Sequence, residues 1–283
     1  MLEIYRFGKI LSLVVTPPVA SCNVGDLLDG VVGQEQERYK GKNNPGGAYL
    51  RMREPASTLS TRLLGLLFRA HPWHGVSIGS DAPALVTSYI EIVPTDTVKY
   101  EMDKATGILK VDRPQRYSNI CPTLYGFIPR TLCAKHVGLY CAEKTGRMGI
   151  VGDGDPLDIC VLTEKTIPHG DILLQAIPIG GLRMIDGNQA DDKIIAVLRD
   201  DAVYGNWRAI SDCSPTLVER LRHYFLTYKD APDATERRCE IVHVYDQHDA
   251  HEVIRRSQRD YREEFGEPDS PRKKRKSKGK GQK

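Results

Sequence analysis

Short segments of alternating apolar and polar residues, separated by turn formers, constrain the fold of this chain most strongly. Alternation places successive side chains on opposite faces of an extended strand, so each segment can bury one face. Residues 103–107 (DKATG) have the composition of a hairpin turn between two such segments. Several short strands at this spacing are typical of an antiparallel barrel or sandwich. The predicted strands are residues 86–93, 97–103, 108–113, 158–164, 171–177, 193–199 and 239–245.

Two helices are predicted in the last quarter of the chain. Ser214 suits the N-cap and Pro215 the first helical position of the first helix, whose apolar face runs through residues 217–228. A second apolar face at helical spacing covers residues 250–265 and ends at Gly266. The fold class is therefore α+β and mainly β.

The two ends of the chain differ from the middle. Residues 1–70 show weak, mixed patterns, so we expect a weakly structured N-terminal extension, with a short helix within 57–70. The net charge of the chain is +3, yet residues 271–283 hold eight Lys or Arg and no acid. The body is therefore acidic, and we expect residues 267–283 to be a disordered basic tail.

Cysteine usage and hydropathy indicate the compartment. The seven cysteines form no CxxC pair, which is typical of free thiols in a reducing environment. No apolar run approaches the roughly 18 residues that a membrane span needs. The first 22 residues include an apolar stretch, but Glu3 and Pro17 favour an extension over a signal or targeting peptide. We expect a cytoplasmic protein.

A cluster of carboxylates is the strongest chemical feature. The stretch IVGDGDPLD sets Asp153, Asp155 and Asp158 within six residues, and a second acidic loop covers residues 186–192. Carboxylates that share a site raise one another's pKa unless cations separate them. Hard divalent cations, Mg²⁺ above all, prefer such oxygen ligands, and their sites commonly bind phosphate as well.

Basic residues recur beside these acids. Alternation places Lys99 and Glu101 on one face of their strand, and it places Asp191 beside Lys193 if that strand extends so far. Any one of the acids alone is more simply a solvated turn residue. A calcium loop is excluded because Asp158 stands where the sharp turn needs glycine. The recurrence of acids beside bases at strand ends favours a common site.

Several motifs strongly resemble soluble inorganic pyrophosphatases of family I. They are GDGDPLD, KYEMD, VDR, the YGF that follows a proline, and the D-x₄-D-x-K of DGNQADDK. The resemblance spans about residues 71–265, so residues 71–266 are expected to form the inorganic pyrophosphatase domain. It implies an OB-like antiparallel five-stranded barrel with flanking helices. It also implies Mg²⁺-dependent hydrolysis of pyrophosphate to two orthophosphates, with several Mg²⁺ per active site, in a homo-oligomer.

The resemblance implies a role for each matching residue. Asp153, Asp158 and Asp191 would bind the first catalytic Mg²⁺, and Asp158 would also reach the second. Asp155 would be the general base beside a metal-bound water that attacks in line, without a covalent intermediate. The other implied metal-binding residues are Asp186, Glu91 and Glu101. The implied phosphate-binding residues are Lys99, Arg113, Tyr125, Lys193, Tyr228 and Lys229.

Some of these assignments have alternatives. Tyr125 and Tyr228 could be core aromatics, and Arg113 could be a surface charge at a strand end. Glu91 matches the family pattern only with a gap of one residue. The family usually has a tyrosine four residues before Tyr125, where this chain has Cys121. The excursion between Tyr125 and the GDGDPLD motif is expected beside the mouth of the site.

Two other functions remain open at this point. An OB-type barrel with the basic tail could bind nucleic acid, although the acidic loops and the few aromatic residues argue against binding by the body of the protein. We expect contact with nucleic acid only through the tail. A metal-dependent hydrolase of other phosphoanhydrides is the second alternative, because absence of a base-binding motif is weak evidence.

Overall fold

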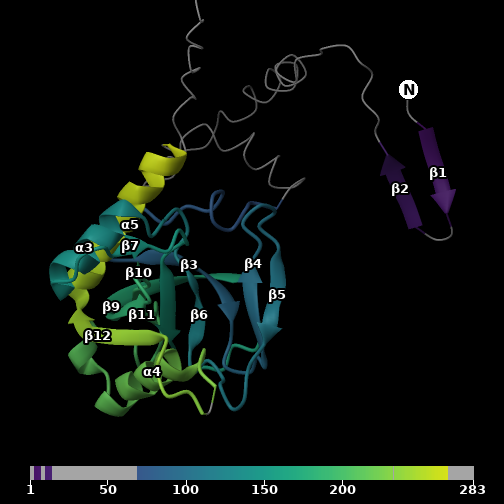
Figure 1. Ribbon diagram of the computed structural model, residues 1–283. Helices are drawn as coiled ribbons and strands as arrows, with labels where there is room; N and C mark the ends of the chain where they lie inside the picture. The colour runs from purple at the N-terminus through teal and green to yellow at the C-terminus, as the bar shows by residue number, and fades with distance from the viewer. Residues whose placement is uncertain (1–2, 8–9, 15–68, 232, 267–283) are drawn as a thin grey trace, which may run out of the picture. The chain divides into compact units, whose positions relative to one another are not determined.

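The computed structural model describes residues 3–7, 10–14, 69–231 and 233–266 (Figure 1). Near the N-terminus, β1 (Glu3–Phe7) and β2 (Ile10–Val14) pair as an antiparallel hairpin. Most of the expected extension lies outside the described residues, and so do nearly all of the short helix expected within 57–70 and the whole basic tail. Those three expectations stay predictions.

Five strands of the main body form a closed ring. Each strand pairs with the next, and the last pairs again with the first. This arrangement confirms the predicted mainly β class with a five-stranded ring. In order around the ring they are β3 (Val86–Ile92), β6 (Leu124–Phe127), β8 (Asp158–Leu162), β11 (Lys193–Leu198) and β9 (Ile172–Asp186).

The ring is not antiparallel throughout. Four of its pairings are antiparallel, whereas β8 and β11 run parallel. Strand direction cannot alternate at every step around a closed ring with an odd number of strands, so one parallel pair is required. The ring is therefore mainly antiparallel, as predicted, with one parallel pair that the prediction did not specify. This parallel pair sets Asp158 opposite Lys193 in the register.

Two features of the ring differ from the sequence prediction. Strand β9 continues well past the predicted end at residue 177, and its second half pairs with both β11 and β12 (Cys239–Asp246). Strand β6 was not predicted, since it has only four residues and one is Gly126. A Cβ on Gly126 would lie 1.9 Å from the carbonyl oxygen of Tyr89, so only glycine allows β6 to approach β3 this closely.

The remaining strands lie around the ring. The predicted hairpin is β4 (Val98–Met102) with β5 (Leu109–Pro114), and it forms a separate two-stranded sheet. Two short strands, β7 (Val151–Gly152) and β10 (Gln189–Ala190), pair in parallel. They bring the GDGDPLD segment beside the acidic loop that follows β9 (Figure 1).

Among the described residues, three α-helices cover the strands (Figure 1). Two of them, α4 (Pro215–Thr227) and α5 (Gln247–Phe265), confirm the predicted helices, while α3 (Lys135–Thr145) occupies the excursion before β7. A 3₁₀ turn, η2 (Ile210–Asp212), precedes α4. Helices α3 and α5 pack together and against one part of the core, and α4 packs next to β12 over the other part.

Part of the core is built by the faces that the sequence predicted to be apolar. Val253 and Ile254 of α5 are fully buried, as are Ile194 and Ala196 of β11. Burial of a large aliphatic side chain contributes about 1.5–3 kcal/mol, so these faces fix the helix against the ring. The six described cysteines are all buried and free. In the described part of the chain, no helix is long and apolar enough to cross a membrane.

Candidate active site

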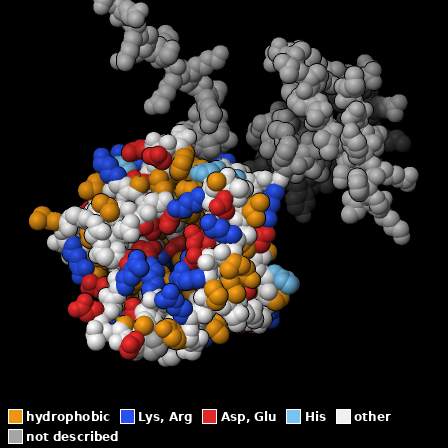
Figure 2. Space-filling view, turned by 45° about the vertical axis from the view of Figure 1, so that its right-hand side comes forward, with side chains coloured by type: hydrophobic (Ala, Val, Ile, Leu, Met, Phe, Trp, Pro, Cys, Tyr) orange, Lys and Arg blue, Asp and Glu red, His pale blue; other side chains and the backbone are white. Residues whose placement is uncertain are grey.

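A cavity of about 530 Å³ collects the candidate residues. All thirteen residues predicted from the sequence line it, although they come from strands and loops spread between residues 91 and 229. Acidic and basic side chains gather around a hollow on this face of the molecule (Figure 2). The residues from the predicted set are Glu91, Lys99, Glu101, Arg113, Tyr125, Asp153, Asp155, Asp158, Asp186, Asp191, Lys193, Tyr228 and Lys229.

Lys193 lies at the centre of the site. Its side chain is 1% exposed, and the ammonium group forms ion pairs with both Asp158 and Asp191. Tyr125 donates a hydrogen bond of 2.6 Å to Asp158 from the neighbouring strand. The parallel pairing of β8 and β11 explains the first contact. Asp191 lies just before β11, which begins at Lys193, so the strand extension on which their predicted shared face depended is not observed, although the two side chains are in contact.

The electrostatics of this centre favour an added cation. Burial, and then repulsion by Asp191, raise the pKa of Asp153 to about 8. Burial likewise raises the pKa of Asp158, although Lys193 opposes the effect. Burial would lower the pKa of Lys193, but Asp158 and Asp191 raise it well above its ordinary value. One lysine thus faces three carboxylates, so their negative charge is not fully balanced. A hard divalent metal ion, which prefers oxygen ligands, would supply the missing positive charge.

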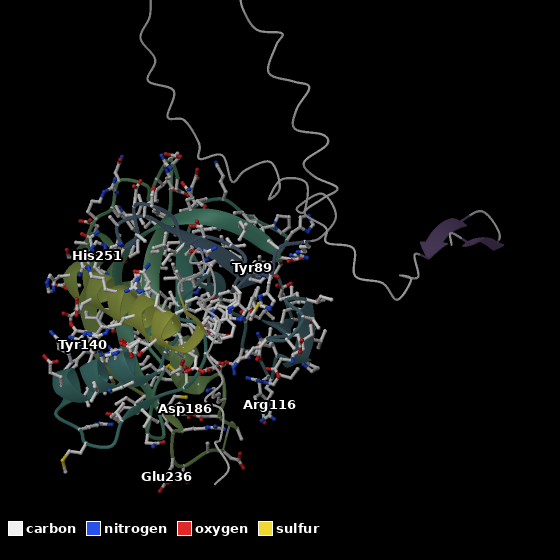
Figure 3. All side chains as sticks on the ribbon, turned by 90° about the horizontal axis from the view of Figure 1, so that it is seen from above. Tyr89, Arg116, Tyr140, Asp186, Glu236 and His251 are labelled. Atoms are coloured by element: carbon white, nitrogen blue, oxygen red, sulfur yellow. The ribbon has the colours of Figure 1, made fainter. Side chains whose placement is uncertain are left out.

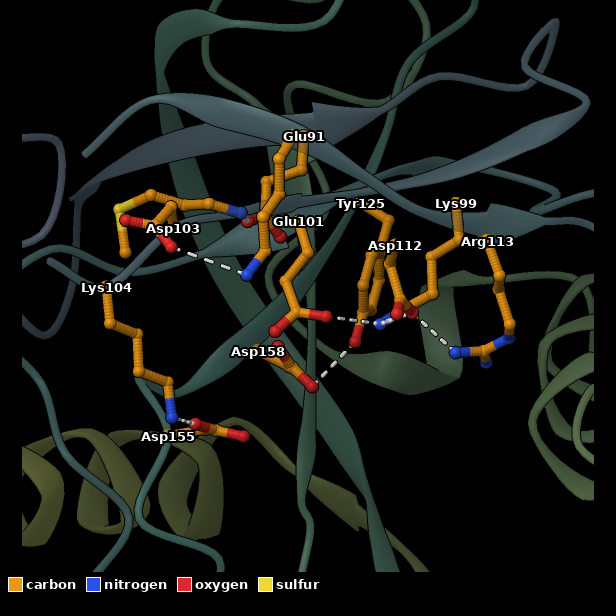
Figure 4. Close-up of polar contacts among 12 residues, drawn as sticks. Glu91, Lys99, Glu101, Asp103, Lys104, Asp112, Arg113, Tyr125, Asp155 and Asp158 are labelled. Atoms are coloured by element: carbon orange, nitrogen blue, oxygen red, sulfur yellow. Dashed lines mark hydrogen bonds and ion pairs between the residues drawn. The ribbon is translucent and has the colours of Figure 1, made fainter. Parts of the chain in front are cut away.

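Asp155 lies at the edge of this centre (Figure 4). The tight turn places Gly154 at φ +79°, and the Asp155 backbone N–H donates to Asp153 Oδ1 at 2.9 Å. The Asp155 side chain is 47% exposed and forms an ion pair with Lys104 from the turn after β4. A partly exposed carboxylate next to buried ones is suited to exchange protons with water.

The β4–β5 hairpin forms one wall (Figure 4). Lys99 donates to Glu101 and to Asp112, each at 3.0 Å, so the predicted shared face of Lys99 and Glu101 is confirmed. The hairpin register shifts at Asp112, which is an extra residue on β5. This bulge breaks the alternation and directs both Asp112 and Arg113 toward the cavity, where they form an ion pair.

A second bulge presents Glu91. The register between β3 and β6 shifts at this residue, so Glu91 has no partner on β6. Its side chain is buried and accepts a hydrogen bond of 2.7 Å from the Met102 backbone N–H. Burial raises the pKa of Glu91 to about 8. The residue that matched the family pattern only with a gap therefore does line the cavity.

The opposite wall carries Asp186 at the end of β9. Lys229 and Arg238 contact its two oxygens at 2.6 and 3.0 Å. Burial raises the pKa of Asp186, but Lys229 and Arg238 outweigh burial and lower this pKa below its ordinary value. Tyr228, directly before Lys229, closes α4, packs partly against the core and also lines the cavity.

Sequence reasoning missed several lining residues. Alternation does not indicate Asp112 because it lies in a bulge. Lys104 lies in a turn and Arg238 in a loop, where no regular pattern applies. Gln189 lies in a two-residue strand that no periodicity reveals. The polar lining residues that were not predicted are Lys104, Asp112, Arg116, Gln189 and Arg238.

Fold and cavity together define a mainly β enzyme whose carboxylates and cations suit metal-dependent chemistry on phosphates. The model of the inorganic pyrophosphatase family matches residues 88–262. The chain belongs to the inorganic pyrophosphatase family, whose members are metal-dependent hydrolases of the diphosphate bond.

Known proteins support this membership. The chain is 55% identical to the inorganic pyrophosphatase of Chlamydia trachomatis serovar L2 over 196 residues, which cover 68% of this chain and 94% of that protein. It is 40% identical to the soluble inorganic pyrophosphatase of Oryza sativa subsp. indica over 188 residues, or 65% and 79% of the two chains. The crystal structure of the Thermus thermophilus inorganic pyrophosphatase matches with a TM-score of 0.57 and 27% identity, over 68% of this chain and 99% of that one.

Proposed function

We propose that this cavity binds several Mg²⁺ ions and hydrolyses inorganic pyrophosphate to two orthophosphates by direct in-line attack of water. The observation that carries the proposal is the cluster of Asp153, Asp158 and Asp191 around one buried lysine, inside a cavity lined by further cations. Such an arrangement is costly to ionise without added positive charge.

The carboxylates supply the metal ligands in this proposal. Asp153, Asp158 and Asp191 would hold the first ions, because Asp158 and Asp191 share Lys193 and both lie close enough to Asp153 to raise its pKa. The remaining candidate ligands are Asp186, Glu91 and Glu101. When bound, Mg²⁺ lowers the pKa of coordinated water and neutralises charge on phosphate.

Asp155 is the proposed general base. Its carboxylate reaches the cavity from a rigid turn and is half-exposed, so it can accept a proton from the attacking water and pass it to solvent. Its neighbours Asp153 and Asp158 are more buried and are assigned to the metal ions instead. Lys104 holds the Asp155 side chain over the cavity in the absence of substrate.

The cations and phenols are the proposed phosphate-binding groups. Charge that develops on the electrophilic and leaving phosphates would be stabilised by donors that are already fixed in the cavity. Lys193 and Lys229 lie on the ring side and Lys99 and Arg113 on the hairpin wall, so the substrate would lie between them. Tyr228 would add a hydroxyl donor. Tyr125 would do so only on giving up its hydrogen bond to Asp158, because a phenol has a single O–H.

Phosphate release tests the proposal and its alternative. We expect rapid release from pyrophosphate with Mg²⁺, little release in EDTA, and slow release from ATP and tripolyphosphate. A preference for ATP would favour the hydrolase of other phosphoanhydrides. Asp155→Asn should lower kcat by about 100-fold or more while KM changes little, because a base acts on the chemical step. Asp212→Asn, whose carboxylate lies outside the cavity, is the matched control.

The domain and assembly assignments belong to the same proposal. Residues 71–266 are assigned as the catalytic domain, residues 1–70 as an extension and residues 267–283 as a basic tail. Six buried free thiols support a reducing, cytoplasmic compartment. The family resemblance supports a homo-oligomer, which light scattering would measure. Deletion of residues 271–283 should leave hydrolysis unchanged.

A further inference from the structure

One cation of the cavity differs from the other six. Among the described residues, Arg116 is the only lining Lys or Arg whose side chain makes neither an ion pair nor a hydrogen bond. Each of the other six is held by a carboxylate of the same cavity. Those six are Lys99, Lys104, Arg113, Lys193, Lys229 and Arg238.

The backbone around Arg116 is fixed even though its side chain has no partner. The Gln115 N–H donates to the Thr97 carbonyl at 2.9 Å, and the Asn119 N–H donates to the Arg116 carbonyl at 3.1 Å. The Asn119 amide donates to the Thr227 carbonyl at 3.4 Å, directly before Tyr228. The segment is therefore tied to the start of β4 and to the end of α4.

This segment presents Arg116 at the mouth of the cavity. Arg116 is exposed and lies on the same side of the molecule as Asp186, which lines the same cavity (Figure 3). Cys121, five residues later, is fully buried and does not line the cavity. Arg116 is thus the residue of this segment that offers a donor to a bound anion.

We propose that Arg116 is a further substrate-binding residue, which holds a terminal phosphate of pyrophosphate with paired N–H···O hydrogen bonds. This inference rests on the proposed function. The guanidinium group presents donors in a planar fork that matches two phosphate oxygens. A carboxylate of the cavity already balances part of the charge on each of the six paired cations, whereas no carboxylate among the described residues balances the charge of Arg116.

Steady-state kinetics of three variants test this role. Arg116→Gln should raise KM for magnesium pyrophosphate about tenfold, because a hydrogen bond to a charged group contributes about that factor at an exposed site. The same variant should change kcat by less than about threefold, as expected when binding is lost equally from substrate and transition state. The KM of Arg116→Lys should lie between those of the unmodified enzyme and Arg116→Gln, because lysine keeps the charge but lacks the planar pair of N–H donors.

A matched control and a binding measurement complete the test. Arg220 is also exposed and unpaired among the described residues but lies outside this cavity, so Arg220→Gln should leave KM unchanged. Calorimetry with methylenediphosphonate and Mg²⁺ should give about tenfold weaker binding to Arg116→Gln only. Unchanged analogue binding in Arg116→Gln, or a fall in kcat at constant KM, would overturn the role of Arg116. If the unmodified enzyme binds the analogue without hydrolysing pyrophosphate, the proposed function fails, and the calorimetry still decides Arg116.

Discussion

Tyr125 and Asp158 join two adjacent strands of the ring through one hydrogen bond, which the phenol donates to Asp158 Oδ2 at 2.6 Å. The same oxygen accepts from Lys193, so two donors from different strands hold one carboxylate. Burial raises the pKa of both Tyr125 and Asp158. The phenol thereby orients a proposed metal ligand and remains protonated while it does so.

Replacement of this phenol should impair catalysis. Tyr125→Phe keeps the ring but removes the donor, and a hydrogen bond to a charged group is worth about 1.5–3 kcal/mol. We expect kcat/KM for pyrophosphate to fall by about 10- to 100-fold. Tyr89 donates an equally short bond of 2.6 Å to Asp171 outside the cavity, so Tyr89→Phe is the control. Equal losses in the two variants would contradict the assignment.

Lys193 should stabilise the metal-free protein. Its side chain is 1% exposed and neutralises Asp158 and Asp191, so Lys193→Met leaves buried carboxylates without a counter-charge. Removal of one partner of a buried ion pair costs about 3–5 kcal/mol. Urea unfolding in EDTA should show this loss, and Mg²⁺ should restore part of it. A metal-free variant as stable as the unmodified protein would contradict this account.

The stability of the metal-free protein should fall as pH rises. In the folded state Asp153 and Glu91 each have a pKa of about 8, above their ordinary values of 3.8 and 4.5. The folded state therefore binds more protons than the unfolded state between about pH 4 and pH 8. The free energy of unfolding decreases as pH rises through this window. Each group can contribute up to about 1.4 kcal/mol per pH unit.

Unfolding free energies in EDTA from pH 5 to pH 9 measure this dependence. Mg²⁺ affinity should rise over the same interval, because the ligands must lose protons to bind the ion. Asp153→Asn should flatten the EDTA profile, since it removes one titrating group. A free energy of unfolding that increases from pH 5 to pH 8 in EDTA would contradict this prediction.

A buried charge pair behind the site should also be essential for stability. Arg183 Nε lies 3.5 Å from Asp192 Oδ2, and both side chains are 1% exposed. The guanidinium also lies 4.9 Å from the centre of the Tyr140 ring and 4.8 Å from that of the Tyr245 ring. Asp192→Asn leaves the arginine with less counter-charge and should cost about 3–5 kcal/mol. The double variant Arg183→Met with Asp192→Asn should recover much of the loss in thermal unfolding. A double variant less stable than the single one would refute this explanation.

Much of the site could be predicted because the strand period is simple. Alternation set Lys99 beside Glu101, and the two side chains are in contact. Asp191 also contacts Lys193, but it lies before the start of β11, where alternation does not apply. The helices α4 and α5 followed from apolar residues at helical spacing, since their buried faces are continuous. The family resemblance, rather than periodicity, linked residues from distant segments to one cavity.

The rest depends on local irregularities. Asp112 was missed because a β-bulge reverses the face that alternation assigns to it. Helix α3 was missed because its pattern misleads: Gly138 is buried, whereas Leu139 is 53% exposed. Arg238 reaches Asp186 from a loop, where no period applies. The parallel pair β8–β11 follows only once the ring is known to close with five strands.

The central claim is that folding brings Asp153, Asp158 and Asp191 together to hold divalent metal ions. Anomalous diffraction from crystals soaked in Mn²⁺, which replaces Mg²⁺ in oxygen-ligand sites, tests it most directly. The account predicts strong anomalous peaks in contact with the oxygens of these three aspartates, and their loss in Asp158→Asn. Mn²⁺ bound elsewhere on the protein, with none between these aspartates, would contradict it.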